Sequence, residues 1–518
     1  MVENYGPNSL QTEKIFHKVI AYIHNYRYAI LGSLIAGLLA YTFMFTNKLP
    51  NHDDVFYMFS KGAALESGRW GLYILSFIFP DYSMPWIYGI LSLLILAAGN
   101  CILVRLFSVK NAVLQFLLGA VLITFPSQIG TFSYMFTSAA YAIAYFMSVS
   151  AAYIMCKCDK KLMAIAFLAM FFSLSIYQAY ISITCSIMIV FAIYQTIACK
   201  DSAKPIFKKG LGFILFLILS TAVYMISTQA IMKITGETFS EYTSDSLTPT
   251  IASITEGIKL AYQKFVTIFR NQEHKLVLSR TSQYVHFYFI ALILGELMLW
   301  IFLKKDILKS LLLLFLMGVL PLGINLMYLF SSPYSIHTLV LYSASSVYVL
   351  LIVVIEQGQH IPFNKILNKL HVLALDFAVT GLLAVMFINI YAANEAYLNM
   401  SMKYENAHSF ATSVVTHLQN TPGYTKESEV ALIGDYSEHE LYTNFYSNLI
   451  DLTGVNGVNP DDYSFTRFFD MYTGTAVNWA SETKCAEIAQ SEVFASLPSY
   501  PEYGYVSKIG DTFVIKLS

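Results

Sequence analysis

The stretch YAILGSLIAGLLAYTFMFTNKLPNHDDVFYMFSKGAALESGRWG, residues 28–71, joins a long apolar run to a segment with two adjacent acids, Asp53 and Asp54. The run Tyr28–Thr46 has no charged side chain and is long enough to cross a bilayer core of roughly 30 Å. The rest of the chain has the same character, because 56% of its 518 residues are hydrophobic and only 13% are charged. Soluble domains carry about 25% charged residues. The composition therefore indicates an α-helical polytopic membrane protein.

A window of about 19 residues finds further apolar runs of membrane length as far as Ala392. We predict about eleven transmembrane helices. The run from Leu162 to Ala198 is too long for one span, so we divide it at SIYQAY, residues 175–180. The expected spans are approximately Tyr28–Thr46, Trp86–Val104, Ala112–Gln128, Tyr134–Cys156, Leu162–Ser175, Ile181–Ala198, Leu211–Lys233, His286–Leu303, Leu311–Leu329, Thr338–Glu356 and Val372–Ala392.

The distribution of positive charge orients these spans. Short connections with several Lys or Arg residues alternate with PSQIGTFS, SIYQAY and SSPYSIH, which hold neither residue type. Because basic connections stay in the cytoplasm, we expect a cytoplasmic N-terminus and, after an odd number of spans, an extracytoplasmic C-terminal region. The outer face then carries the loops 47–85 and 234–285 and the tail 393–518.

The chain divides into two predicted domains, a transmembrane domain of residues 1–392 and a small extracytoplasmic α/β domain of residues 393–518. In the second domain, EVALIGD has the character of a strand, and YGYVSKIGDTFVIKL that of a hairpin turning at Gly510–Asp511. SFTRFFDMYTG and KCAEIAQSEVFASL have helical spacing. We predict that residues 395–420 form a helix that leads from the last span into this domain.

Charge and motifs argue against two classes of function. The formal net charge of -1 provides no basic surface for nucleic acid, and the sequence has no recognisable RNA-binding module. It also has no Walker or GxGxxG nucleotide loop, which argues against a pump driven by ATP within this chain. We therefore expect no nucleic-acid partner and no bound nucleotide.

Asp53 and Asp54 open the segment DDVFYMFSKGAALESG, which predicts an amphipathic helix at the membrane interface. Two interpretations of the pair stay open. Acids in the first turn of a helix satisfy free N–H groups, and such a cap stabilises the helix by about 0.5–2 kcal/mol. A carboxylate at headgroup level is also placed to take the proton of a hydroxyl that attacks a sugar on a polyprenyl phosphate. That transfer needs no nucleotide, and its phosphate leaving group requires cationic or hydrogen-bonding partners.

The pattern NHDDVFYMFSKGAALESGRWG after a first span, the SIYQAY turn and an exterior C-terminal domain together resemble the GtrII family of bacterial membrane glucosyltransferases. That family is associated with the GT-C class of polyprenyl-dependent enzymes. The resemblance implies an inverting transfer of glucose, or a related hexose, from undecaprenyl-phosphate-sugar to a cell-surface polysaccharide or its lipid-linked precursor, an O-antigen-like or cell-wall glycan. It places this reaction on the outer face of the bacterial plasma membrane. The acids among which the base of this class is sought match Asp53 and Asp54.

The partners implied by the resemblance are a polyprenyl-phosphate-linked sugar donor, a polysaccharide acceptor and membrane lipid. No cofactor follows from the sequence. Whether the reaction uses a divalent cation, Mg²⁺ or Mn²⁺, stays open. Two adjacent carboxylates are too few ligands to define a metal site. We therefore assign no metal ligand.

Other residues of the predicted outer face are candidates for contact with the donor. In one continuous helix Arg69 would lie roughly 22 Å from Asp54, so it approaches the acids only if the chain bends at Ser67–Gly68; otherwise it caps the helix or contacts lipid. Tyr177 and Gln178 either line a cavity or anchor the SIYQAY turn at the interface. Candidate phosphate ligands among the outer cations, with a solvated or structural role as the alternative, are Arg270, Lys275, Arg280 and His337.

A transporter or flippase for a lipid-linked saccharide is the alternative function. Transport does not require a large exterior domain, and transporters commonly contain inverted repeats, which are not visible in this sequence. A membrane-bound glycosyltransferase is therefore the preferred interpretation.

Overall fold

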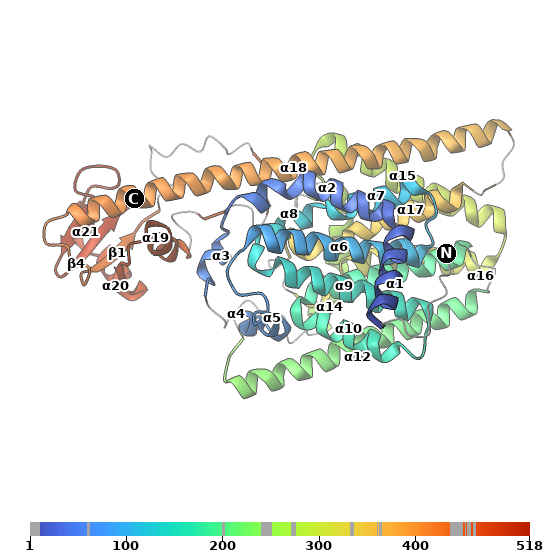
Figure 1. Ribbon diagram of the computed structural model, residues 1–518, viewed down its shortest axis with the longest axis horizontal. Coiled ribbons are helices and arrows are strands. Elements are labelled where there is room, and N and C mark those ends of the chain that lie inside the picture. The colour runs from blue at the N-terminus through green and yellow to red at the C-terminus, as the bar shows by residue number, and fades with distance from the viewer. Residues whose placement is uncertain are drawn as a thin grey trace.

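The computed structural model shows a helical bundle with a small sheet beyond one of its ends (Figure 1). We call this end the sheet end of the bundle. The long helix α18 runs along the bundle and continues to the sheet. The structure describes residues 11–59, 63–198, 202–239, 251–270, 276–331, 336–359, 361, 365–435, 449–450, 452, 457–458 and 463–518.

Within these residues, nine helical segments are long and apolar enough to cross a membrane. The helices α7 (Ala112–Ile123) and α8 (Pro126–Ser133) pass the same test as a pair bent by 47°, and α10 (Met163–Ile176) is apolar but shorter. Each span expected from the sequence overlaps one of these segments. The nine are α2 (Arg27–Thr46), α6 (Pro85–Phe107), α9 (Met135–Lys157), η1 (Gln178–Tyr180) with α11 (Ile181–Ala198), α12 (Ala203–Thr235), α15 (Arg280–Lys304), α16 (Ile307–Ile324), η4 (Thr338–Ser345) with α17 (Ser346–Gly358), and α18 (Lys365–Asn420).

Small residues set the spacing of the N-terminal helices. A Cβ atom on Gly32 of α2 would lie 2.0 Å from the carbonyl oxygen of Phe116, and one on Gly119 of α7 would lie 2.3 Å from that of Ala29. Glycine at both positions therefore lets the two backbones touch, as is common where helices pack in lipid. Asn100 of α6 completes this contact, because its amide donates to the hydroxyl of Ser33 at 3.1 Å.

The segment after α2 differs from the single amphipathic helix that the sequence predicted. It forms the short helices α3 (His52–Phe56), α4 (Ala63–Glu66) and α5 (Trp70–Leu75). The backbone is left-handed at Phe59, with φ 64°, and at Gly68, with φ 70°, and a helix does not continue through such residues. PSQIGTFS, expected as a simple connection, forms the buried helix α8.

The C-terminal elements are close to those predicted. The helix expected over 395–420 is the last part of α18, whose 56 residues span about 84 Å and thus extend well beyond a bilayer core. The predicted strand and hairpin are confirmed as β1 and as the antiparallel pair β3–β4. The sheet order is β2-β1-β4-β3, with β1 parallel to both neighbours. The elements are β1 (Glu429–Ile433), α19 (Phe465–Thr473), β2 (Asn478–Trp479), α20 (Glu482–Ala489), α21 (Glu492–Ser496), β3 (Val506–Ile509) and β4 (Thr512–Lys516).

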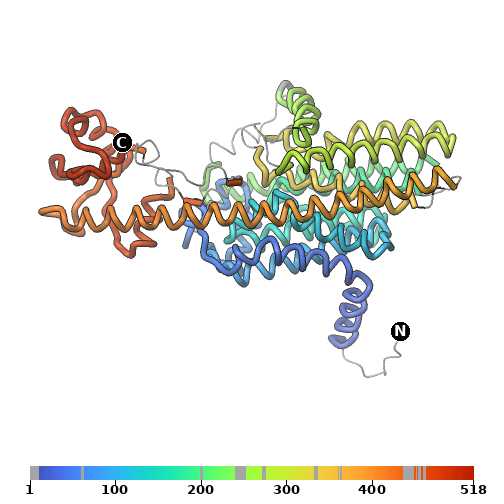
Figure 2. Tube along the Cα trace, turned by 90° about the horizontal axis from the view of Figure 1, so that it is seen from above, coloured from blue at the N-terminus to red at the C-terminus, as the bar shows by residue number. Residues whose placement is uncertain are grey.

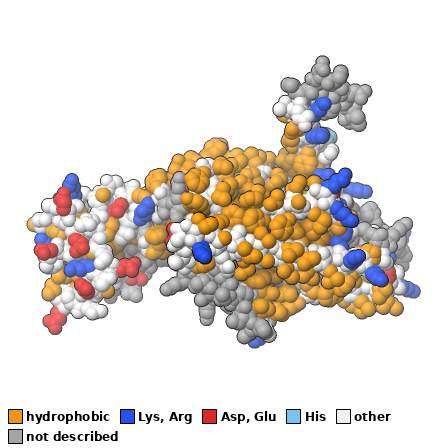
Figure 3. All heavy atoms as spheres, turned by 90° about the horizontal axis from the view of Figure 1, so that it is seen from below, with side chains coloured by type: hydrophobic (Ala, Val, Ile, Leu, Met, Phe, Trp, Pro, Cys, Tyr) orange, Lys and Arg blue, Asp and Glu red, His pale blue; other side chains and the backbone are white. Residues whose placement is uncertain are grey.

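Side chains of different character occupy different parts of the surface. In Figure 3 a hydrophobic belt covers the bundle, Asp and Glu side chains gather on the part that contains the sheet, and many Lys and Arg side chains lie at the opposite end. The N-terminal helix α1 (Gln11–Asn25) turns away from the bundle (Figure 2). The remaining described helices are α14 (Ile251–Arg270) and η2 (Leu326–Leu329).

Candidate active site

The acidic pair lies in the first turn of α3, at the sheet end of the bundle. Asn51 caps this helix, because its side-chain oxygen accepts the N–H of Asp53 at 2.8 Å. Asp54 completes a capping box by accepting the N–H of Asn51 at 3.0 Å. The capping interpretation therefore holds for Asp54. The two acids differ in their surroundings and are considered separately.

The carboxylate of Asp54 is buried and engaged by three donors. In addition to Asn51, the hydroxyl of Ser83 and the N–H of Phe136 donate to it, the latter at 3.3 Å. Only 1% of the residue is exposed. Burial raises the pKa of Asp54 to about 7, although the three hydrogen bonds favour the charged form. Asp54 is thus a carboxyl group that holds a proton up to near neutral pH, in a position that a large substrate does not reach.

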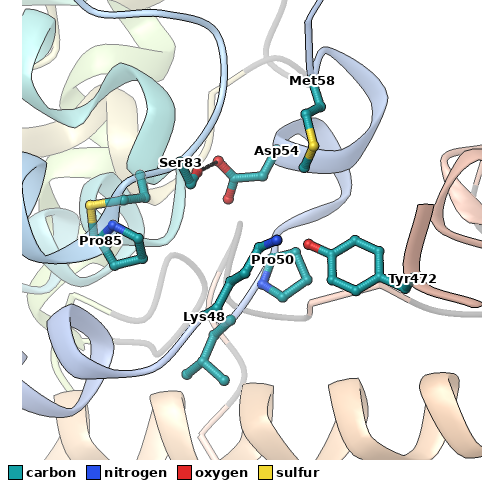
Figure 4. A pocket seen from close by; sticks show the side chains of 9 residues that line it. Lys48, Pro50, Asp54, Met58, Ser83, Pro85 and Tyr472 are labelled. Carbon is teal, nitrogen blue, oxygen red and sulfur yellow. Dashed lines mark hydrogen bonds between the residues drawn. The ribbon is translucent and has the colours of Figure 1, made fainter. Parts of the chain in front are cut away.

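A small pocket adjoins Asp54 where the first loop meets α19 (Figure 4). Ser83 forms one wall, and Tyr472 of α19 points its hydroxyl toward the pocket from the other side. No partner of this buried hydroxyl is found among the described residues. Nζ of Lys48 lies 4.8 Å from the centre of the Tyr472 ring. The pocket is therefore built by residues from both ends of the chain.

Asp53 is the accessible acid of the pair, with 28% of its side chain exposed. Its carboxylate accepts a hydrogen bond from the hydroxyl of Tyr463, and Nε2 of His52 lies 3.8 Å from Oδ1. Burial raises the pKa of Tyr57, and the charge of Asp53 adds to this increase. The ring of His52 meets that of Tyr134 edge to face, with centroids 5.9 Å apart. Asp53 is therefore the acid of the pair that a substrate can reach.

The bend on which the role of Arg69 depends is present. Gly68 has a left-handed backbone, and its carbonyl oxygen accepts the hydroxyl of Tyr224 at 3.1 Å. The amide of Gln178 donates to the carbonyl oxygen of Ser67 at 2.9 Å and to the Tyr224 hydroxyl at 2.8 Å. Gln178 of the SIYQAY turn thus fixes the break between α4 and α5, a positioning role that the sequence did not indicate.

Arg69 points from this bend toward tyrosines of the bundle. Its Nη1 donates to the hydroxyl of Tyr141 at 3.0 Å, and its guanidinium carbon lies 5.1 Å from the centre of the Tyr177 ring. The rings of Tyr141 and Tyr177 are themselves stacked, with centroids 4.5 Å apart. The positive charge of Arg69 lowers the pKa of Tyr57, the phenol whose pKa Asp53 raises. Arg69 and Asp53 consequently act on one common neighbour.

The other predicted cations lie on different elements. Arg270 ends α14 and Arg280 begins α15; both are exposed, and the side-chain amide of Gln283 donates to the carbonyl oxygen of Arg270. His337 precedes η4, next to the point where the Ser127 hydroxyl donates to the Thr338 carbonyl at 2.6 Å. Lys275 lies outside the described residues.

Several residues of the site were not found by sequence reasoning. They are Tyr57, Tyr134, Tyr141, Tyr224, Tyr463 and Tyr472. Tyrosine occurs 37 times in the chain, so its presence at any one position carried no signal. Arg467 of α19, which donates to the carbonyl oxygen of Met58, was also missed.

Comparison with known proteins agrees with the resemblance seen in the motifs. Among curated proteins no match to the chain is found. The family model described as glucosyl transferase GtrII matches residues 42–356, which contain α3, the bend at Gly68, the SIYQAY turn and η4. This match covers more than half of the chain. The protein therefore belongs to the GtrII glucosyl transferase family and is a membrane glycosyltransferase.

Proposed function

We propose that the protein transfers glucose, or a related hexose, from undecaprenyl-phosphate-sugar to a cell-surface polysaccharide or its lipid-linked precursor, such as an O-antigen-like or cell-wall glycan. The observation that carries this proposal is that the segment between α2 and α6 holds both an accessible carboxylate, Asp53, and an arginine, Arg69, whose Nη1 donates to the hydroxyl of Tyr141 at 3.0 Å. One group can accept a proton and the other can bind a phosphate. Asp53 in α3 and Arg69 at the start of α5 both lie at the sheet end of the bundle (Figure 1), where a lipid-linked substrate can present its headgroup.

In this mechanism Asp53 acts as the general base. An acceptor hydroxyl gives its proton to the Asp53 carboxylate while its oxygen attacks the anomeric carbon of the sugar. The bond from that carbon to the phosphate oxygen breaks, and its electrons leave with undecaprenyl phosphate. Attack from the side opposite the phosphate inverts the anomeric configuration. A single base is sufficient, because the phosphate departs as a stable anion.

Arg69 stabilises the charge that develops on the departing phosphate. A guanidinium can bind two phosphate oxygens at once, which favours arginine at such a position. Tyr141 and Tyr177 hold its side chain, and Gln178 and Tyr224 hold the bend that presents it. We keep as further candidate contacts to the carrier phosphate Tyr177, Gln178, Arg270, Lys275, Arg280 and His337.

Asp54 has a structural role in this proposal. It caps α3 and binds Ser83 and Phe136, so it fixes the helix from which Asp53 projects. The described residues contain no group of three or more His, Cys, Asp or Glu side chains suited to a metal ion. We assign no metal ligand and leave a need for Mg²⁺ or Mn²⁺ to direct measurement.

For the cellular arrangement we propose about eleven spans in a bacterial plasma membrane, with a cytoplasmic N-terminus. A transmembrane domain of residues 1–392 then has its sheet end on the outer face, and the extracytoplasmic domain is 393–518. The alternation of basic and uncharged connections supports this orientation. So does the concentration of Lys and Arg at the end away from the sheet (Figure 3).

The function is tested with purified protein in vesicles that contain undecaprenyl-phosphate glucose. The expected result is release of undecaprenyl phosphate together with glucose attached to an acceptor polysaccharide added outside. Movement of the intact donor across the bilayer without bond cleavage would instead show a flippase. An acid far from the site, Asp159, provides a control variant, Asp159→Asn, which should transfer glucose at the wild-type rate.

A further inference from the structure

Aromatic side chains from two distant parts of the chain meet beside Asp53. The ring of Tyr463, which precedes α19, lies with its centroid 5.0 Å from that of Phe56 and 5.7 Å from that of His52. Both pairs meet edge to face. Phe56 is 41% exposed and Tyr463 is 56% exposed. We call His52, Phe56 and Tyr463 the aromatic platform.

Neighbouring contacts join the two segments that carry the platform. Arg467, one turn after Tyr463, donates to the carbonyl oxygen of Met58. Below the platform, Val55 of α3 is fully buried in the same apolar cluster as Phe465 and Phe468 of α19. The segment that carries Tyr463 is therefore docked on the first loop, and the exposed rings do not result from a loose contact.

Two explanations of the exposed rings can be compared. Aromatic residues at a membrane interface direct their polar atoms to water and lipid headgroups. The Tyr463 hydroxyl instead donates to the carboxylate of Asp53, the proposed base. Tyr463 also belongs to the part of the chain whose surface carries many Asp and Glu side chains (Figure 3), which is unsuited to contact with lipid tails. A polar ligand that also has an apolar face fits these surroundings better than lipid.

We propose that the aromatic platform is the acceptor subsite and binds a hexopyranose ring of the acceptor glycan. The inference rests on the proposed function, because it gives the acceptor a place beside Asp53. The C–H face of a pyranose ring is weakly positive and packs on the negative face of an aromatic ring. Its hydroxyl groups point outward, so one of them can reach the Asp53 carboxylate next to the Tyr463 hydroxyl. A carboxylate has acceptor capacity for both donors.

Tyr463 has a second role in this arrangement. In the absence of acceptor its hydroxyl holds one orientation of the Asp53 carboxylate. The acceptor hydroxyl then meets a base that already has the required geometry. Because residues 42–356 are the part that matches the family, Tyr463 lies outside it. The subsite therefore combines α3, which lies within the residues that match the family, with a residue that lies outside them.

The test measures initial rates with undecaprenyl-phosphate glucose and envelope polysaccharide extracted from the source organism, each varied in turn. The variants are Tyr463→Ala, Phe56→Ala and Tyr463→Phe. Tyr503, which is fully exposed in the C-terminal part, provides the matched control Tyr503→Ala. A separate measurement follows release of undecaprenyl phosphate to water when no polysaccharide is present.

Tyr463→Ala and Phe56→Ala should each raise the KM for the polysaccharide about tenfold, the order expected for loss of one aromatic contact. The KM for undecaprenyl-phosphate glucose should stay unchanged in both variants, and the control Tyr503→Ala should release undecaprenyl phosphate to water at the wild-type rate. Tyr463→Phe should keep the KM for polysaccharide and lower kcat, because it retains the ring and loses the hydroxyl. Unchanged KM values for the polysaccharide in both alanine variants, equal to that of Tyr503→Ala, would overturn the subsite. If wild-type protein itself released no undecaprenyl phosphate, the proposed function would fail, which is a distinct result.

Discussion

The buried carboxyl group of Asp54 leads to a specific prediction about the variant Asp54→Asn. Burial raises the pKa of Asp54 from an ordinary 3.8 to about 7. The folded protein therefore keeps the Asp54 proton between about pH 4 and pH 7, while the unfolded chain releases it. Over this window the folded state binds more protons, so the stability contributed by this group falls as the pH rises. One pKa unit corresponds to about 1.4 kcal/mol, so the loss from pH 4 to pH 8 amounts to about 4 kcal/mol.

Asparagine at position 54 resembles the protonated acid. Its oxygen can accept from Ser83 and from the N–H of Phe136, but its NH2 group cannot accept the N–H of Asn51, so this capping contact is lost. At pH 4 we expect the variant to be about 1–3 kcal/mol less stable than wild type, because the buried N–H of Asn51 loses its acceptor. At pH 8 we expect it to be the more stable protein, because it has no buried charge to desolvate.

The assay is thermal unfolding in detergent, followed by intrinsic fluorescence at several pH values between 4 and 8. Other titrating groups affect wild type and variant equally, so the difference in Tm between the two isolates Asp54. This difference should shift in favour of Asp54→Asn as the pH rises from 4 to 7 and should level off above pH 7, where the folded protein also releases the Asp54 proton. A difference that stays constant over the whole range would refute the reasoning, because it would mean that Asp54 has the same pKa in the folded and unfolded states.

Three further variants test the proposed active site. Asp53→Asn should lower the rate of glucosyl transfer by about 10²–10⁴-fold, the usual contribution of a general base, and leave Tm within a few degrees of wild type; a transfer rate close to wild type would remove Asp53 from the mechanism. Arg69→Lys should raise the KM for undecaprenyl-phosphate glucose and lower kcat, because lysine loses the two-point contact to phosphate, and an effect on the polysaccharide KM alone would speak against this role. Gly68→Ala should destabilise the protein by about 1–2 kcal/mol, the cost of a left-handed alanine, with unfolding as the readout. Its new Cβ would also lie 3.1 Å from the Tyr224 hydroxyl, so donor affinity should fall with stability, and a variant with unchanged donor KM would show that the bend does not position Arg69.

The helices were predictable because long apolar runs have few alternatives in a membrane. The runs from Tyr28 and Trp86 reappear as α2 and α6 with similar bounds. The hairpin at Gly510–Asp511 was equally clear, since a turn pair between two apolar strands is a strong local signal. The sequence allowed a bend at Ser67–Gly68 but did not require one. Its presence depends on hydrogen bonds to Gln178 and Tyr224, which are far away in sequence.

The composition of the candidate site was less predictable than the fold. Sequence reasoning proposed Asp53, Arg69 and Gln178 from local motifs, and their roles in the reaction stay predictions. It missed Tyr463, which is separated from Asp53 by 410 positions and meets it only because α18 carries the C-terminal part back to the first loop. No periodicity or motif encodes such a contact. Long-range packing around Val55 creates it, and only the three-dimensional structure reveals it.

The geometry of α3 explains why two adjacent acids have two different roles. Successive residues of a helix point about 100° apart, so neighbouring carboxylates cannot face the same partner. Asp54 is in the position that reaches back to the N-cap residue Asn51, and this contact buries it. Asp53 must then project away from the cap, toward Tyr463 and the solvent. In this helix a capping acid at position 54 thus fixes the direction of the acid at position 53, and the pair combines a structural carboxyl group with one that is available for chemistry.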